Sequence, residues 1–100
     1  MIHSVYFWLK DEAKDQCVEF EDALRELVKI PEIKLAHWGV PADTAERPVT
    51  DHSYHYSLVL SFESQERHDI YQDHPDHHVF VKQCKDLWEK VVVYDTEVRS

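Results

Sequence analysis

The chain has 100 residues, of which 43% are hydrophobic, and this is enough for one domain with a modest core. Its formal net charge of −9 argues against binding to nucleic acid or to an anionic membrane, because both are held mainly by lysine and arginine. A single glycine in the whole chain excludes glycine-rich phosphate loops and dinucleotide fingerprints.

Residues 2–9 predict the first strand, since they are rich in β-branched and aromatic side chains. Alternate residues of a strand point to opposite faces, and here the two sets are His3, Val5, Phe7, Leu9 and Ile2, Ser4, Tyr6, Trp8. Both sets contain large apolar groups. We therefore expect both faces of the sheet to be covered.

Residues 11–29 predict a helix, because apolar side chains recur at spacings of four and three from Ala13 to Leu27. Pro31 ends it, since proline cannot continue a helix interior. Residues 33–40 predict a second strand, in which we expect the backbone to require the only glycine, Gly39.

Residues 41–51 contain two prolines and mixed charges, and they predict an irregular loop. Residues 54–62 predict a third strand, because aromatic and aliphatic residues alternate with small or polar ones. Ser64 is a good N-cap for a helix that we expect to run to about Gln72.

His74 precedes a proline, so its backbone is expected to be extended, and Pro75 suits the first turn of another helix. The apolar stripe of that helix is expected to comprise Val79, Phe80, Cys84, Leu87, Trp88 and Val91. Residues 91–98 predict the last strand.

This order of elements, βαββαβ, predicts a ferredoxin-like α+β fold in a single domain over residues 1–100. Its four-stranded antiparallel sheet would have helices on one face only. Something must bury the other face, and the sheet of a second copy is the natural partner. We therefore expect a homodimer that forms an α+β barrel.

Several segments resemble one known family when they are read in order: His3 to Phe7, Ile30-Pro31, Trp38-Gly39, Tyr54 to Ser64, Tyr71-x-x-His74-Pro75-x-His77, and Trp88 to Asp95. Together they are similar to the stress-responsive dimeric α/β barrel (Dabb) domain over nearly the whole chain. The resemblance implies a homodimer whose two sheets pack into a barrel. Most members of that family have no established reaction.

A plant polyketide cyclase of this family, which makes olivetolic acid, is similar over the same segments. The resemblance implies that Tyr71 and His77 stand where that enzyme acts on a linear polyketide, and that His3 and Trp88 also match. Glu19 and Ala23 or Leu24 stand where the cyclase has bulky aromatic residues. This difference in the pocket wall argues against the same substrate.

The chemistry that these residue types allow is acid–base catalysis. His77 can take a proton from a carbon next to a carbonyl, and Tyr71 can donate a hydrogen bond to the enolate oxygen. The alternative is structural: a histidine that caps a helix and a tyrosine packed in the core. His3 is a further polar candidate, although a histidine among apolar neighbours is more often a core residue.

The histidine-rich segment raises the question of a metal, since it contains His68, His74, His77, His78, Asp73 and Asp76. Its spacing matches no strong ligand motif such as H-E-x-x-H. The proline after His74 predicts a turn, and this turn accounts for the position of His74 without a metal ion. We therefore expect no metal ion and no cofactor.

We expect a cavity between the sheet and the helices, lined by apolar side chains and a few polar groups, as is usual for small-molecule sites. Its ligand-contacting residues are expected to be His3, Val5, Phe7, Phe20, Leu24, Leu58, His74 and Trp88, with His77 and Tyr71 as catalytic residues.

The resulting hypothesis is a homodimer that binds a small oxygenated or aromatic molecule, with cofactor-free cyclase- or isomerase-like chemistry. The alternative is a non-catalytic stress-responsive dimer in which the Tyr/His motif is structural. The N-terminus lacks the basic region and cleavage site of a signal peptide, so a cytoplasmic location is expected.

Overall fold

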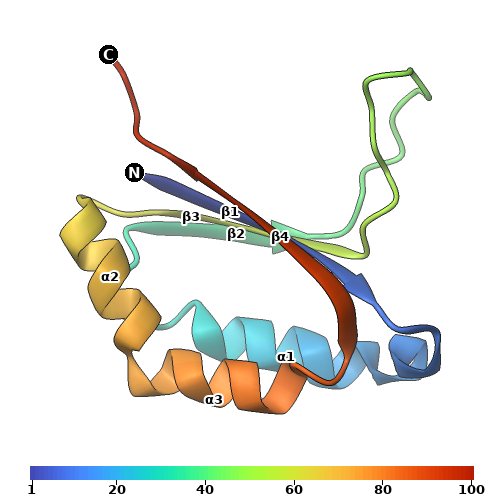
Figure 1. Ribbon diagram of the computed structural model, residues 1–100, viewed down its shortest axis with the longest axis horizontal. Helices are drawn as coiled ribbons and strands as arrows, with labels where there is room; N and C mark the ends of the chain where they lie inside the picture. Colours follow the sequence, from blue (N-terminus) through green and yellow to red (C-terminus); the bar gives the residue numbers. More distant parts are fainter.

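The computed structural model describes all residues, 1–100, as one antiparallel sheet covered on one face by helices (Figure 1). The helical segments are a 3-10 segment η1 (Asp11–Gln16) and the helices α1 (Cys17–Leu27), α2 (Gln65–Asp73) and α3 (Pro75–Cys84). The strands are β1 (Ile2–Leu9), β2 (Leu35–Gly39), β3 (Tyr56–Ser61) and β4 (Trp88–Thr96). Their order in the sheet is β2-β3-β1-β4, and every neighbouring pair is antiparallel. This is the ferredoxin-like α+β fold that the order of elements predicts.

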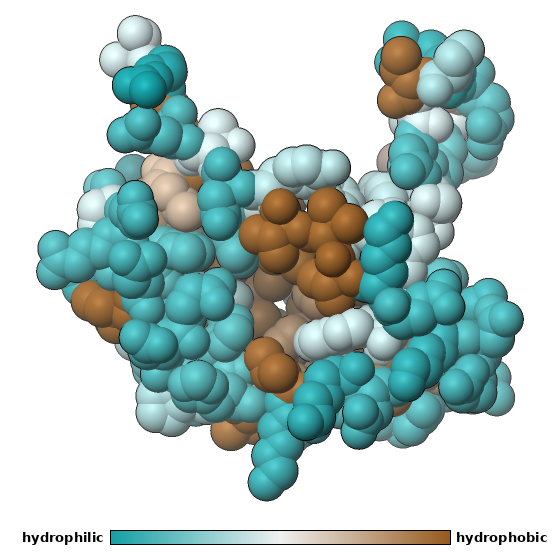
Figure 2. Space-filling model, in the orientation of Figure 1, coloured by the Kyte–Doolittle hydropathy of each residue, from teal (hydrophilic) through white to brown (hydrophobic).

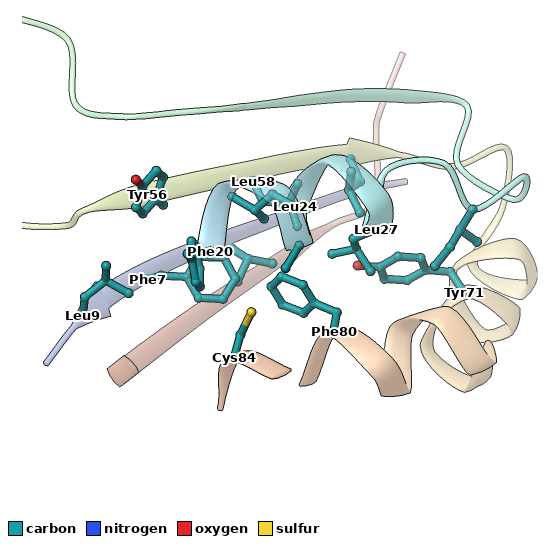
Figure 3. Close-up of a cluster of buried hydrophobic side chains, with 14 of the residues drawn as sticks. Phe7, Leu9, Phe20, Leu24, Leu27, Tyr56, Leu58, Tyr71, Phe80 and Cys84 are labelled. Carbon is teal, nitrogen blue, oxygen red and sulfur yellow. The ribbon is translucent and has the colours of Figure 1, made fainter. Parts of the chain in front are cut away.

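The two central strands divide their side chains cleanly between the faces. In β1 the residues alternate strictly between partly exposed and buried, beginning with partly exposed Ile2, and β3 follows the same rule. The inner set faces the helices and joins α1 and α3 in a core of 15 buried residues. Figure 3 shows Phe20 and Leu24 of α1 between Phe7 and Leu58 of the sheet and Phe80 and Cys84 of α3.

The first helix begins differently from the prediction. Residues 11–16 form a 3-10 segment rather than α-helix, and neither Lys10 nor Gln16 provides a side-chain cap. Asp11 forms an ion pair with Lys14, three residues along, at 3.0 Å. Residues three apart lie directly above one another in a 3-10 helix, so this pair suits the tighter winding.

The third helix ends earlier than predicted. Helix α3 stops at Cys84, and β4 begins at Trp88. Leu87, Trp88 and Val91 therefore lie on a turn and a strand rather than on a helical stripe. Trp88 pairs with Leu9 on β1, so the valine-rich segment that begins at Trp88 forms the edge strand of the sheet. This pairing outweighs the helical spacing of its apolar residues.

The two helix starts near the histidine-rich segment agree with the sequence. The Ser64 hydroxyl accepts a hydrogen bond from the Arg67 amide at 3.2 Å. The backbone of His74 is extended, its Nδ1 accepts from the Asp76 amide at 3.0 Å, and Pro75 occupies the first turn of α3. His74 is therefore the N-cap of α3.

The sequence predicts a backbone that requires a glycine at position 39, and the structure does not bear this out. The φ of Gly39 is not positive, and a Cβ placed on it would meet no atom within 4 Å. The backbone of this protomer therefore does not require glycine at this position. Gly39 pairs with Ser57, so it belongs to the outer set of sheet residues.

The outer face of the sheet carries no helix. Residues 40–55, which form a long arm without helix or strand, and the C-terminal residues both project on the side opposite the helices (Figure 1). Backbone and side-chain bonds anchor the arm: the Leu9 amide donates to His55 Nδ1 at 2.9 Å, and Trp8 Nε1 donates to the Ser53 hydroxyl at 3.0 Å. No helix is long and apolar enough to cross a lipid bilayer.

Candidate functional site

A cavity of about 200 Å³ lies between the sheet and the helices α2 and α3. Its lining is mostly apolar and consists of His3, Val5, Phe7, Leu27, Leu58, Tyr71, Gln72, His77, Phe80, Val81, Trp88, Val91 and Val93. On the face of the molecule in Figure 2, hydrophobic side chains border a hollow where β4 passes over the helices. The few polar groups in such a lining are the ones that can orient a ligand.

The structure brings most of the proposed site residues to this cavity. His3, Val5, Phe7, Leu58, Tyr71, His77 and Trp88 all line it. Phe20 and Leu24 do not, because both are completely buried inside the core. His74 also lies outside the lining, since its ring caps α3.

Tyr71 and His77 meet although they belong to different helices. Tyr71 is in the last turn of α2 and His77 is in the first turn of α3, so the break at His74-Pro75 turns the chain between them. Their ring centroids are 4.9 Å apart, in an edge-to-face arrangement. The short turn that the sequence implied does place the imidazole and the phenol side by side.

His77 has an imidazole nitrogen without a partner. Its Nδ1 is buried and makes no hydrogen bond. Burial lowers the pKa of His77 below 6.5, and the nearby His78, His3 and His68 lower it further, while Asp73 opposes them. At neutral pH the ring is therefore uncharged, which is the form that can accept a proton.

Tyr71 is 1% exposed and packs against Phe62, with ring centroids 5.2 Å apart. In Figure 3 its ring extends from α2 toward Leu27, another residue of the cavity lining. Burial alone raises the pKa of Tyr71 above its usual range. Its hydroxyl therefore keeps its proton at neutral pH and remains a hydrogen-bond donor.

His3 lies beside this pair and is held by a carboxylate. Its Nδ1 is 2.5 Å from Oδ1 of Asp95, the residue opposite it in the β1–β4 ladder. Its ring is 5.9 Å from that of Tyr71 and 4.8 Å from that of His68. Burial lowers the pKa of His3 more than the Asp95 carboxylate raises it.

Two polar residues of this neighbourhood were not among the proposed site residues. His68 and Asp95 join His3 in a group whose possible ligand atoms all lie within 4.8 Å of one another. His68 precedes Tyr71 by three positions in α2, and this spacing on one helix face could have indicated it. No local pattern could have indicated Asp95, because its pairing with His3 joins residues 92 positions apart.

The outer face of the sheet carries a second hollow, of about 430 Å³. It lies between the sheet and the arm, and it is lined by Tyr6, Trp8, Val49, Thr50, Asp51, Tyr54, Val92 and Tyr94. Tyr94 is 62% exposed and Val49 is 81% exposed. This face is therefore rich in aromatic and aliphatic surface that the protomer leaves in contact with water.

The family model of the stress responsive A/B barrel domain (Dabb) matches residues 1–98, and the chain belongs to this family. A search of curated proteins gives no significant match.

Solved structures share the fold over nearly the full length of the chain. A protein of Arabidopsis thaliana is 27% identical, with a TM-score of 0.80 over 99% of this chain and 95% of that one. A dimeric ferredoxin-like protein of Thermobifida fusca is 24% identical, with a TM-score of 0.74 over 93% and 85%. The hydroxynitrile lyase of Passiflora edulis is 21% identical, with a TM-score of 0.75 over 99% and 95%. The last two likenesses concern the fold alone.

Proposed function

We propose that this Dabb-family protein is a homodimer that binds a compact oxygenated or aromatic molecule in the inner cavity and moves a proton next to a carbonyl group. His77 is the base, and Tyr71 is the hydrogen-bond donor. The observation that carries this proposal is the buried, unpartnered Nδ1 of His77, on a ring whose centroid is 4.9 Å from that of the Tyr71 ring in an edge-to-face arrangement.

In the proposed reaction, His77 takes a proton from the carbon next to the carbonyl of the bound molecule. The C–H bond breaks, an N–H bond forms, and the electron pair moves to the carbonyl oxygen. The Tyr71 hydroxyl donates a hydrogen bond to that oxygen and stabilises the enolate. The enolate then takes the proton back from His77, either on the same carbon or, in a conjugated enolate, on a carbon further along. Alternatively, its carbon attacks a second carbonyl in an aldol-type closure, and the resulting alkoxide takes the proton back from His77. Neither step requires an oxidant or a reductant.

The size of the cavity restricts the ligand. Its volume of about 200 Å³ is below the range of about 300–1,000 Å³ that is usual for drug-sized molecules. The lining supplies aromatic surface from Phe7, Phe80 and Trp88, with ring centroids 5.4 Å apart for Phe7–Trp88. A compact molecule with one aromatic ring or a short acyl chain and a carbonyl group suits this space.

The homodimer rests on the outer face of the sheet. Tyr94 on this face is exposed, Tyr6, Trp8 and Val92 are partly exposed, and the arm of residues 40–55 stands beside them. Burying such a patch against an identical sheet removes apolar surface from water in both copies. The Thermobifida fusca protein, which shares the fold, is dimeric, and this supports the proposal.

Enzymatic activity also exists on this fold. The Passiflora edulis protein is a hydroxynitrile lyase. This supports the proposal only by analogy of fold, because one fold can host many unrelated activities. The activity of this chain depends on its own site residues.

The test is the exchange of α-protons of phenylacetone in D₂O, followed by proton NMR. Wild-type protein is expected to accelerate exchange over buffer, and His77→Ala to lower the acceleration by about 10²-fold or more, as expected for loss of a general base. Tyr71→Phe keeps the ring and is expected to lower it by a smaller factor. His78→Ala changes an exposed histidine on the same turn that lies outside the cavity lining, and rates close to wild type are expected.

A non-catalytic dimer is the second candidate, and the nearly complete burial of Tyr71 favours it. In that case the motif stabilises the junction of α2 and α3. His77→Ala and Tyr71→Phe would then lower the melting temperature, and wild-type protein would leave the exchange rate of phenylacetone at the value of buffer.

A further inference from the structure

Two histidines face each other across the junction of sheet and helix, and each is held by a carboxylate. His3 Nδ1 is 2.5 Å from Asp95 Oδ1, and His68 Nδ1 is 3.0 Å from Asp69 Oδ1. An ionised carboxylate can only accept, so each Nδ1 carries the proton. In the His68 ring the Nε2 lone pair is therefore free to bind a third group.

The free nitrogen of His68 lies in an unusual place. His68 Nε2 is buried, and no hydrogen-bond partner lies near it. Buried polar atoms are nearly always paired, so an orphaned one needs an explanation. Its neighbour is the His3 ring, 4.8 Å away between centroids, which supplies a second nitrogen but not a suitable hydrogen-bond donor.

The His68–Asp69 pair is typical of a histidine that binds a metal. Such histidines usually donate their other ring N–H to a carboxylate, which fixes the tautomer and the orientation of the ring. His3, His68 and Asp95 can each offer one ligand atom, and these atoms lie within 4.8 Å of one another. Imidazole with carboxylate suits zinc and related transition metals, whereas magnesium and calcium prefer oxygen ligands.

We propose that His3, His68 and Asp95 bind a divalent ion of the zinc class, with Nε2 as the ligand atom of His68 and with the ion replacing the proton that His3 Nδ1 and Asp95 share. Three protein ligands leave one position of a tetrahedral ion open. His3 also lines the inner cavity, so the ion would lie at the edge of the space in which a ligand would bind. Water or an oxygen atom of the bound molecule would fill it.

The proposed ion site differs from a metal site formed by the histidine-rich segment, residues 68–78. In the histidine-rich segment, His74 is used as a helix cap and His78 is exposed, and only His68 belongs to the proposed site. The other two ligands come from the first and last strands. The proposal does not depend on His77 and Tyr71 as the acid–base pair.

The test is zinc binding by protein that has been freed of metal with a chelator, measured by isothermal titration. One ion per protomer is expected, and zinc is expected to raise the melting temperature in a manner that excess EDTA reverses. Cobalt(II) should bind to the same site and give the visible spectrum of a tetrahedral ion. Absence of saturable binding of either ion to the wild-type protein overturns the proposal.

Three variants locate the ion. His68→Gln is expected to weaken zinc binding by more than tenfold, and Asp69→Asn, which removes the carboxylate behind His68, by about 10–100-fold. The Asp69 side chain is 62% exposed, so this variant is informative even if His68→Gln does not fold. The control is His78→Gln, for which wild-type affinity is expected.

If His78→Gln weakens binding as much as His68→Gln does, zinc binds the exposed part of the histidine-rich segment and the proposal is wrong. The phenylacetone assay uses different residues. Failure of zinc binding therefore leaves the acid–base proposal standing, and the reverse also holds.

Discussion

The two faces of the sheet differ in what packs against them, although both faces include side chains of the same strand, β1. On the inner face, Val5, Phe7 and Leu9 of β1 are 2–6% exposed and belong to the core. On the outer face, Tyr6 and Trp8 of the same strand border an open hollow beside the arm. The inner face is completed by helices of this chain, whereas the outer face has aromatic surface that no helix of this chain covers.

The comparison teaches that hydrophobicity alone does not identify the core of this protomer. Both residue sets of β1 are apolar, and only the inner one has helices to pack against. The inner face is also where the polar groups of the candidate site are buried. Three predictions test this division, from the largest expected effect to the smallest.

Truncation of the inner face is expected to have the largest effect. Phe20 is completely buried between Phe7 and Tyr56, with ring centroids 5.1 Å and 4.9 Å away. Phe20→Ala is expected to lower the free energy of unfolding by about 3–5 kcal/mol, because it leaves a cavity in the core. Urea denaturation measures this. The control, Val18→Ala, changes a 70% exposed residue near Phe20 on α1 and is expected to change stability by less than about 0.5 kcal/mol.

Charge on the outer face is expected to have a smaller effect on folding and a large one on assembly. Tyr94→Lys places an ammonium group in the proposed interface and is expected to weaken dimerisation by about 2 kcal/mol or more, typical of an interface hot spot. Sedimentation velocity across a concentration series measures the shift to monomer.

Val79→Lys is the matched control for Tyr94→Lys, since Val79 is 50% exposed on the helical side of the molecule. It is expected to leave the dimer intact. A wild-type protein that sediments as a monomer at micromolar concentration would falsify the proposal that the outer face of the sheet is a dimer interface.

The smallest expected effect is a pH dependence that comes from the inner face. Burial lowers the pKa of His77 below 6.5, so the unfolded chain binds more protons than the folded protein as the pH falls through 6.5. Stability therefore decreases toward acid, and it is fully regained above the unfolded pKa. His3, whose pKa is also lowered, contributes in the same direction.

His77→Gln is expected to reduce this loss of stability between pH 7 and pH 5, as measured by urea denaturation at each pH. His78→Gln, on the same turn but exposed, serves as the control. An unchanged slope in His77→Gln contradicts the assignment of His77 as a buried, neutral imidazole.

Much of the fold could be predicted because local signals are strong. Alternation in residues 2–9 and 54–62, the cap at Ser64 and the break at His74-Pro75 all lie within a few residues of the features that they specify. The end of α3 was misplaced because Leu87, Trp88 and Val91 fit a helical stripe as well as a strand. Pairing with β1, which is distant in sequence, decides between the two.

The sequence by itself determined the order of elements, the ferredoxin-like fold, the family, and the closeness of Tyr71 and His77, since a short turn joins them. Only the tertiary structure decided that Phe20 and Leu24 are core rather than cavity wall, and that His68 and Asp95 gather around His3. The physical reason is distance along the chain. Local patterns fix the backbone over a few residues, whereas contacts between β1, β4 and α2 exist only after the sheet has brought the two ends of the chain together.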